Sequence, residues 1–162
     1  MSFILSSPSF PPNGQIPPRF TCDADDVAPA LAWSGAPAET KSYALIVDDP
    51  DAPDPAAPKM VYVHWVLYDI PGGATSLPEG VTAVTLPRGA REGLNDWHRT
   101  GYGGPCPPVG RHRYFFKLYA LDALLGDRGE LRKPELLRLM EPHVLASAEL
   151  MGTYARTGKK KR

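Results

Sequence analysis

The sequence predicts a mainly β fold in one domain, on three grounds: the length of the chain, its proline content and three long runs of strand-forming residues. A chain of 162 residues suits a single domain, which buries roughly 70% of the surface of the unfolded chain. Proline supplies 19 of these residues, about 12% of the chain against a usual ~5%. Long helices tolerate so much proline badly, whereas short strands joined by ordered loops tolerate it well.

Three apolar segments are the clearest strands. Residues 42–49 (SYALIVDD) and 112–121 (HRYFFKLYAL) are rich in β-forming side chains. Residues 61–70 (VYVHWVLYDI) are apolar on both alternating faces, which indicates a central strand that is covered on both sides. Edge strands are expected within residues 1–40, and residues 80–87 (GVTAVTLP) predict a shorter alternating strand.

Helix is expected only in the last third of the chain. Pro134 suits the first turn of one helix, where a backbone N–H would lack a partner in any case. Pro142 predicts the start of a second helix, and Gly152 would cap its end. The apolar stripe of this second helix would consist of Val144, Leu145, Ala148 and Met151.

Charge is balanced over the whole chain but is unevenly placed along it. Residues 156–162 (RTGKKKR) carry five of the 18 basic residues and no acidic one. We therefore expect a single domain over residues 1–155 and a basic, frayed C-terminal tail over residues 156–162. The rest of the chain keeps 13 basic against 18 acidic residues, and this mildly acidic body argues against binding of nucleic acid.

The N-terminal segment, MSFILSSPSFPPNGQIPP, has no basic region, and its apolar stretch stops after three residues. This pattern is not that of a signal peptide, and no run in the chain is long enough for a transmembrane helix. We therefore expect a cytoplasmic protein with no transmembrane segment.

Two cysteines, Cys22 and Cys106, provide neither a disulfide framework nor a four-ligand zinc site. Cys106 stands between prolines, six residues before His112. Such a spacing in a proline-rich loop does not establish a nucleophile and its base. A small thiol that faces the core is the commoner state.

An aspartate cluster follows the first long strand, in the sequence VDDPDAPDP at residues 47–55. The spacing of Asp49 and Asp51 occurs in phosphotransferases that form an aspartyl-phosphate, but no helix separates the strands here. Asp49, Asp51, His64 and His112 would suit zinc, iron or manganese if they met, yet no metal-binding spacing accompanies them. A G-x-S-x-G motif is also absent. We therefore expect no metal, no cofactor and no catalytic residue.

A long glycine- and proline-rich loop covers residues 88–111, and loops of this length are usually functional or disordered. Its aromatic residues and prolines favour an ordered, functional loop. Glycines within the sequence GYGGPCPPVGRHRY (101–114) allow close approach of the backbone. His112 and Tyr114 alternate onto one face of the strand that follows. Glycine N–H groups, imidazole, phenol and a proline wall together predict a small, rigid pocket suited to anions.

These motifs together resemble the phosphatidylethanolamine-binding protein family, in particular its bacterial, Raf-kinase-inhibitor-like branch. The resemblance rests on DPDAP at 49–53, HW at 64–65 and GGPCPPVGRHRY at 103–114, in the order and spacing of the family. It extends from FTCD at 20–23 to ELMGTY at 149–154. Nearly the whole chain is therefore covered.

The resemblance implies a large antiparallel sheet packed on a smaller one, with peripheral C-terminal helices. It also implies a cis peptide bond at Ala52–Pro53 and a pocket for phosphate-like anions, including phospholipid headgroups. Cys106 departs from the Gly-Pro-Pro sequence of many eukaryotic members. By motif position, and with Cys106 added, the ligand-binding residues would be Asp49, Asp51, Tyr62, His64, Gly104, Pro105, Cys106, His112 and Tyr114.

The carboxylates of Asp49 and Asp51 would repel an anion in this pocket, so their presence in its wall needs an explanation. We expect Asp49 or Asp51 to hold His64 or His112 as a hydrogen-bond donor and to raise the pKa of that histidine. An amine on a zwitterionic headgroup would then meet a carboxylate.

We therefore expect a non-enzymatic binding protein. One alternative is an inhibitor that binds a target kinase or protease through the surface around the pocket. Another is a hydrolase or phosphatase that acts through aspartate and histidine. The oligomeric state stays open, with a homodimer as one alternative.

Overall fold

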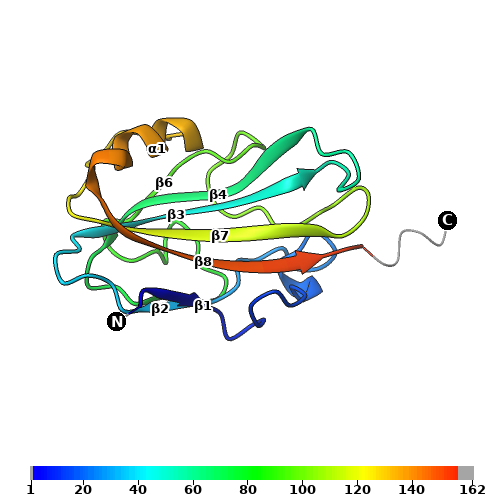
Figure 1. Cartoon of the computed structure of the whole chain (residues 1–162), viewed down its shortest axis with the longest axis horizontal. Helices are drawn as coiled ribbons and strands as arrows, with labels where there is room; N and C mark the ends of the chain where they lie inside the picture. Colours follow the sequence, from blue (N-terminus) through cyan, green and yellow to red (C-terminus); the bar gives the residue numbers. More distant parts are fainter. Residues whose placement is uncertain (1, 157–162) are drawn as a thin grey trace.

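The computed structural model describes residues 2–156, which form two antiparallel sheets and one short α-helix (Figure 1). The strands are β1 (Ile4–Ser6), β2 (Leu31–Ser34), β3 (Ser42–Ala52), β4 (Met60–Pro71), β5 (Ser76–Leu77), β6 (Arg91–Glu92), β7 (His112–Leu121) and β8 (Val144–Tyr154). The helix is α1 (Lys133–Met140), and two 3₁₀ turns are η1 (Pro18–Phe20) and η2 (Glu141–His143). The larger sheet has the strand order β6-β4-β3-β7-β8, and the smaller sheet has the order β1-β2-β5.

The larger sheet forms the middle layer of the molecule, with the smaller sheet on one face and α1 on the other (Figure 1). On the face toward the smaller sheet, Leu45, Trp65 and Phe116 pack with Leu5 and Trp33. A strand that is covered on both faces needs apolar side chains on both, which explains the nearly continuous apolar runs of β3 and β4. The predicted packing of a large sheet on a smaller one is confirmed.

The opposite face of the larger sheet is covered by α1 and the segment that precedes it. Ala44, Ile46 and Val66 pack there with Leu136 and Met140 of the helix. Pro134 lies in the first turn of α1, as expected. The predicted helix at this position is therefore confirmed.

The second predicted helix is wrong, because residues 144–154 form β8. This strand pairs with β7 along its length, from His112 opposite Tyr154 to Ala120 opposite Ala146. Burial alternates along its second half, where Leu150 and Tyr154 face the core. Pairing with a long neighbouring strand overrides the local preference of this segment for helix.

Residues 80–87 do not form the strand that their alternation predicts. Instead they make turns, in which the backbone N–H of Thr82 donates to Oγ1 of Thr85 at 2.8 Å and Leu86 N–H donates to the Thr82 carbonyl at 2.9 Å. Val84 is exposed. Local hydrogen bonds from threonine thus replace those of a sheet ladder.

No helix within residues 2–156 combines the length and the apolar character that crossing a membrane requires. Of the predicted basic tail, Arg156 is described and pairs with Asp23, with 3.0 Å between Nη2 and Oδ1. The rest of the tail, residues 157–162, lies outside the described residues.

The change Gly152→Ala should lower the free energy of unfolding by about 1–3 kcal/mol, the usual cost of overpacking a core. A Cβ atom at this position in β8 would lie 2.6 Å from Ile16 Cγ1 and 2.7 Å from Phe10 Cε2. The matched control is Gly73→Ala, where a Cβ would meet nothing within 4 Å. Urea unfolding of the three proteins measures the effect, and equal destabilisation by both changes would contradict this packing.

Candidate functional site

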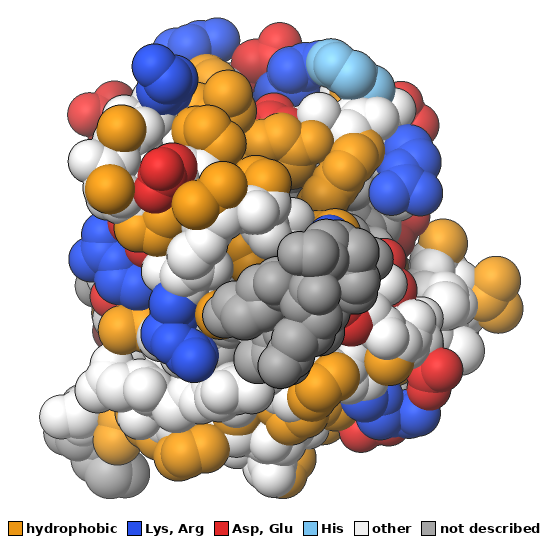
Figure 2. Space-filling view, turned by 90° about the vertical axis from the view of Figure 1, so that its right-hand side faces the viewer, with side chains coloured by type: hydrophobic (Ala, Val, Ile, Leu, Met, Phe, Trp, Pro, Cys, Tyr) orange, Lys and Arg blue, Asp and Glu red, His pale blue; other side chains and the backbone are white. Residues whose placement is uncertain are grey.

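A cavity of about 360 Å³ lies where β3 ends and where β4 and β7 begin. These three strands are antiparallel neighbours, so the end of β3 is flanked by the first residues of the other two. Figure 2 looks onto this end of the molecule, on which hydrophobic side chains gather among charged ones. Of the predicted ligand-binding residues, the cavity is lined by Asp49, Tyr62, His64, Cys106, His112 and Tyr114.

A buried pair of His112 and Asp49 forms one side of the cavity. Nδ1 of His112 donates to Oδ2 of Asp49 at 2.6 Å, and Nε2 lies 3.1 Å from the carbonyl oxygen of Pro53 and 2.9 Å from that of Val109. Oδ1 of Asp49 accepts the backbone N–H of Asp51 at 2.7 Å. Both ring nitrogens thus face oxygen acceptors, an arrangement that is satisfied in full when both carry a proton.

His64 reaches the cavity because β4 is irregular at this point. Two consecutive β3 residues pair with Trp65 and Val63, so that the register skips His64. Such a bulge redirects a side chain, and the His64 ring lies edge-on to Tyr114 with 5.2 Å between the ring centroids. The strict alternation expected along β4 therefore fails where the cavity begins.

The His64 ring is held by the loop that follows β6. Its Nδ1 donates to the carbonyl oxygen of Gly103 at 2.8 Å, and the backbone N–H of Gly103 donates back to the His64 carbonyl at 3.0 Å. Burial lowers the pKa of His64, and this effect outweighs the opposite influence of the Gly103 carbonyl and of Asp49. The expected rise in the pKa of a pocket histidine is therefore wrong for His64.

Aromatic rings enclose His64 on the other sides. Trp97 lies edge-on to both Tyr62 and His64, with centroid distances of 4.9 and 5.0 Å. Edge-to-face packing of this kind is favourable and fixes the orientation of the rings. The cavity is thus shaped before a ligand arrives.

The hydroxyl group of Tyr114 lacks a hydrogen-bond partner, although the residue is only 1% exposed. Among buried side-chain nitrogen and oxygen atoms of residues 2–156, no other atom is in this state. Burial raises the pKa of Tyr114, so the phenol keeps its proton. A buried group of this kind usually finds a partner, and Tyr114 is one of the residues that line the cavity.

Asp51 does not line the cavity, contrary to expectation. Its two oxygens accept bonds from the side chain of Arg113, at 3.0 Å from Nε and 2.9 Å from Nη2, and one oxygen also accepts the Arg113 backbone N–H at 2.9 Å. The hydrogen bond from the guanidinium lowers the pKa of Asp51. The register is irregular between Asp49 and Ala52, which explains why two carboxylates at i and i+2 have separate partners.

Gly104 and Pro105 are buried but likewise do not border the cavity. The Gly104 backbone N–H donates to Oδ1 of Asp26 at 2.8 Å. A Cβ atom at Gly104 would collide with the Phe20 carbonyl. Glycine therefore allows the loop to lie directly on residues 20–26, behind the cavity wall.

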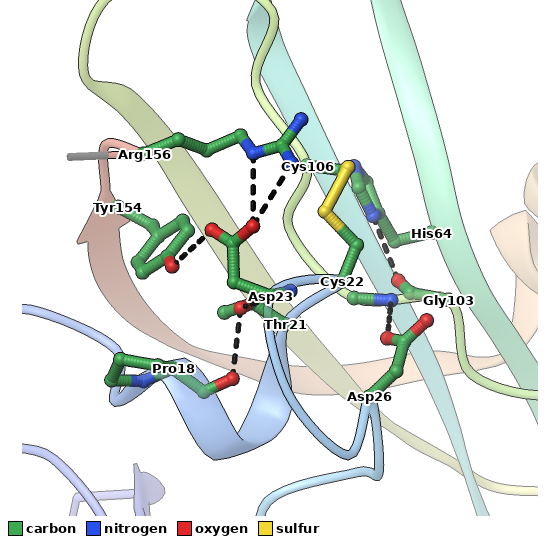
Figure 3. Close-up of a disulfide and its surroundings, with 11 residues drawn as sticks. Pro18, Thr21, Cys22, Asp23, Asp26, His64, Gly103, Cys106, Tyr154 and Arg156 are labelled. Atoms are coloured by element: carbon green, nitrogen blue, oxygen red, sulfur yellow. Dashed lines mark hydrogen bonds and ion pairs between the residues drawn. A yellow bond between two sulfur atoms is a disulfide. The ribbon is translucent and has the colours of Figure 1, made fainter. Parts of the chain in front are cut away.

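Cys106 is bonded to Cys22 in a disulfide, so the expected free thiol and the alternative of a cysteine nucleophile are both wrong (Figure 3). The cysteines are 84 residues apart in the sequence. The backbone N–H of Cys22 also donates to the Pro105 carbonyl at 3.1 Å. The disulfide thus fastens the loop to the N-terminal segment at the edge of the cavity.

Several lining residues were not anticipated from the sequence. The Ala52–Pro53 bond is cis, as expected, yet these two residues were not assigned to the wall. Trp97 could have been found because it is an aromatic residue in the long loop. Pro107 and Pro108 could have been found because they belong to the proline-rich sequence PCPP of the same loop. The residues in question are Ala52, Pro53, Met60, Trp97, Pro107 and Pro108.

Within the described part of the chain, no group of three His, Cys, Asp or Glu side chains is placed to hold a metal ion. The carboxylate of Asp51 bonds to Arg113, and Nδ1 of His112 bonds to Asp49. Within the described residues, the two aspartates and two histidines thus do not come together as the metal-site alternative would require.

The fold and the cavity define a mainly β protein with a small, largely apolar cavity at one end of its central sheet. The family model described as "Phosphatidylethanolamine-binding protein" matches residues 6–155. The chain belongs to the phosphatidylethanolamine-binding protein family.

The similarity to known proteins extends over nearly the whole chain. A UPF0098 protein of Methanothermobacter thermautotrophicus is 48% identical over 153 residues, covering 94% of this chain and 98% of that one. A crystal structure of a phosphatidylethanolamine-binding protein homologue, CT736 of Chlamydia trachomatis, has a TM-score of 0.88 at 38% identity, with 96% and 99% coverage. E. coli YbcL, described as a new member of the mammalian family, has a TM-score of 0.86 at 30% identity, with 97% and 100% coverage.

The titration of His64 should have its midpoint below the ordinary histidine value of about 6.5. Between that lowered pKa and about 6.5, the unfolded chain binds more protons than the folded one, so the free energy of unfolding should fall as the pH drops below about 6.5. NMR of the His64 ring, with urea unfolding from pH 5 to 8, measures both effects.

The control for this titration is His64→Gln, which should lose the part of the pH dependence that belongs to His64. A His64 midpoint at or above that of a short unfolded peptide would contradict the effect of burial.

Proposed function

We propose that the protein is a non-enzymatic binding protein whose cavity takes a small phosphate-like anion, either free or as the headgroup of a phospholipid. The observation that carries this proposal is the unpartnered hydroxyl of Tyr114, a buried donor at the cavity. An anionic oxygen is the partner that such a donor binds most strongly.

His64 supplies a second donor to the same ligand. Because Nδ1 is bonded to Gly103, Nε2 of the neutral ring is an acceptor and becomes a donor on protonation. A bound anion favours the charged ring and offsets the effect of burial on its pKa. Binding is therefore coupled to uptake of a proton.

The His112–Asp49 pair contributes shape to the site. The ring nitrogens of His112 are already bonded to protein oxygens, so this pair holds the end of β3 and the start of β7 in place around the ligand. The side chains of Pro53, Met60 and Trp97 give the site an apolar wall, and electrostatic attraction is stronger in apolar surroundings.

Binding without turnover is favoured by the state of the groups that would attack a substrate. Cys106 has no thiol while it is bonded to Cys22. Both oxygens of Asp49 accept hydrogen bonds from the protein. These groups maintain the cavity and are not poised as nucleophiles.

The change Tyr114→Phe should weaken phosphate binding about tenfold to a hundredfold, since a hydrogen bond to a charged group is worth roughly 1.5–3 kcal/mol. It should leave the free energy of unfolding unchanged or slightly raised, because the lost hydroxyl had no partner. Titration calorimetry with inorganic phosphate and with phosphoethanolamine distinguishes a general phosphate site from a headgroup site.

Tyr119→Phe is the matched control, because Tyr119 lies on the same strand but packs on the side of α1. It should bind phosphate as the wild type does. Equal phosphate affinity of Tyr114→Phe and the wild type, or no measurable binding by the wild type, would refute the proposal.

A further inference from the structure

The disulfide Cys22–Cys106 joins two segments that contain no helix or strand of their own. Residues 101–111 carry the cavity wall on one side, and residues 21–27 support it on the other. Cys106 itself borders the cavity, and both cysteines are partly exposed. A bond in this position is accessible to a reductant and also forms part of a ligand site.

The other attachments of this wall near Cys106 are hydrogen bonds. Gly104 donates to Asp26 at 2.8 Å, and Cys22 donates to the Pro105 carbonyl at 3.1 Å. The Tyr102 hydroxyl donates to the Phe20 carbonyl at 2.7 Å, and Gly103 is bonded to His64. Each is a single hydrogen bond, worth far less than a covalent link. The disulfide is therefore the strongest attachment of this wall to residues 21–27 (Figure 3).

The supporting segment is anchored to the sheet independently of the disulfide. The hydroxyl of Tyr154 donates to Asp23 at 2.6 Å, and Arg156 donates to the same carboxylate at 3.0 Å (Figure 3). Thr21 donates to the Pro18 carbonyl at 2.8 Å. Opening the disulfide therefore releases mainly residues 101–111, while residues 21–27 remain in place.

We propose that Cys22–Cys106 is a redox-modifiable site, which a dithiol reductant opens under native conditions and which thereby controls the ligand affinity of the cavity. The effect on affinity rests on the proposed function, whereas the release of the wall does not.

The exchange is balanced in atoms and electrons. A thiolate of the reductant attacks one cysteine sulfur, the Cys22–Cys106 bond breaks, and a mixed disulfide forms. The second thiol of the reductant then displaces the remaining cysteine. The protein gains two electrons and two protons as two thiols, and the dithiol is oxidised to its own disulfide.

Release of the wall changes the cavity through Gly103, which lies three residues before Cys106. Gly103 holds Nδ1 of His64 and exchanges a backbone hydrogen bond with it. When residues 101–111 gain freedom, His64 loses a fixed orientation and Pro107 and Pro108 leave the wall. Ligand binding must then order the loop again, which lowers the affinity.

The test compares the oxidised full-length chain, the same protein reduced with dithiothreitol, and the double variant Cys22→Ser/Cys106→Ser. Thiol titration should detect two thiols per chain after reduction without denaturant. Hydrogen exchange measured by mass spectrometry should become faster in residues 101–111 and stay unchanged in β3 and β7. Phosphate affinity should fall roughly fivefold or more, as is typical of coupled sites, and reoxidation should restore it.

The double variant should behave like the reduced protein and should not respond to dithiothreitol. If this variant fails to fold, the reduced wild-type protein decides the matter alone. Unchanged exchange in residues 101–111, no reaction without denaturant, or unfolding of the whole sheet on reduction would each overturn the proposal. If the oxidised protein does not bind phosphate, the proposed function fails, and the exchange rates still decide whether the disulfide holds the wall.

Discussion

The hydrogen bond between His112 and Asp49 is the interaction on which the architecture of this end of the molecule depends. It connects the first residue of β7 with the end of β3. The second nitrogen of the ring binds the carbonyls of Pro53 and Val109, and the second carboxylate oxygen binds the N–H of Asp51. One buried pair thus organises the turn after β3 and the end of the long loop. Loss of either partner would leave a buried polar group unsatisfied, which is costly.

The aspartates after the first long strand share a sequence motif but have separate tasks. Asp48 is 1% exposed and accepts Lys133 of α1 at 2.7 Å, on the face of the sheet away from the cavity. Asp49 positions His112, and Asp51 binds Arg113. Three carboxylates within four residues are tolerated because each has a cationic or hydrogen-bonded partner of its own. The charges of Asp48 and Asp51 are therefore compensated by basic side chains within the fold.

The sequence predicted the parts of the fold whose pattern is local. The strands β3 and β4 are predictable because burial on both faces leaves a nearly continuous apolar run. The strand β7 is predictable because it is rich in β-forming side chains. Residues 144–154 were misread because they contain alanine, leucine, glutamate and methionine, which favour helix, while their pairing partner is distant in the sequence. Local pattern also could not separate Asp49 from Asp51, because an irregular backbone changes their faces. Nor could it pair Cys22 with Cys106, since 84 residues of sequence separate them.

The proline residues of the cavity wall have a consequence for the kind of molecule that can be recognised. Pro53, Pro107 and Pro108 have no backbone N–H. An extended peptide cannot add to this wall as a further strand, because the ladder of main-chain donors that strand addition requires is missing. At these positions the wall therefore offers contact area and shape, and a polar group on a ligand would have to meet side chains instead of main-chain donors.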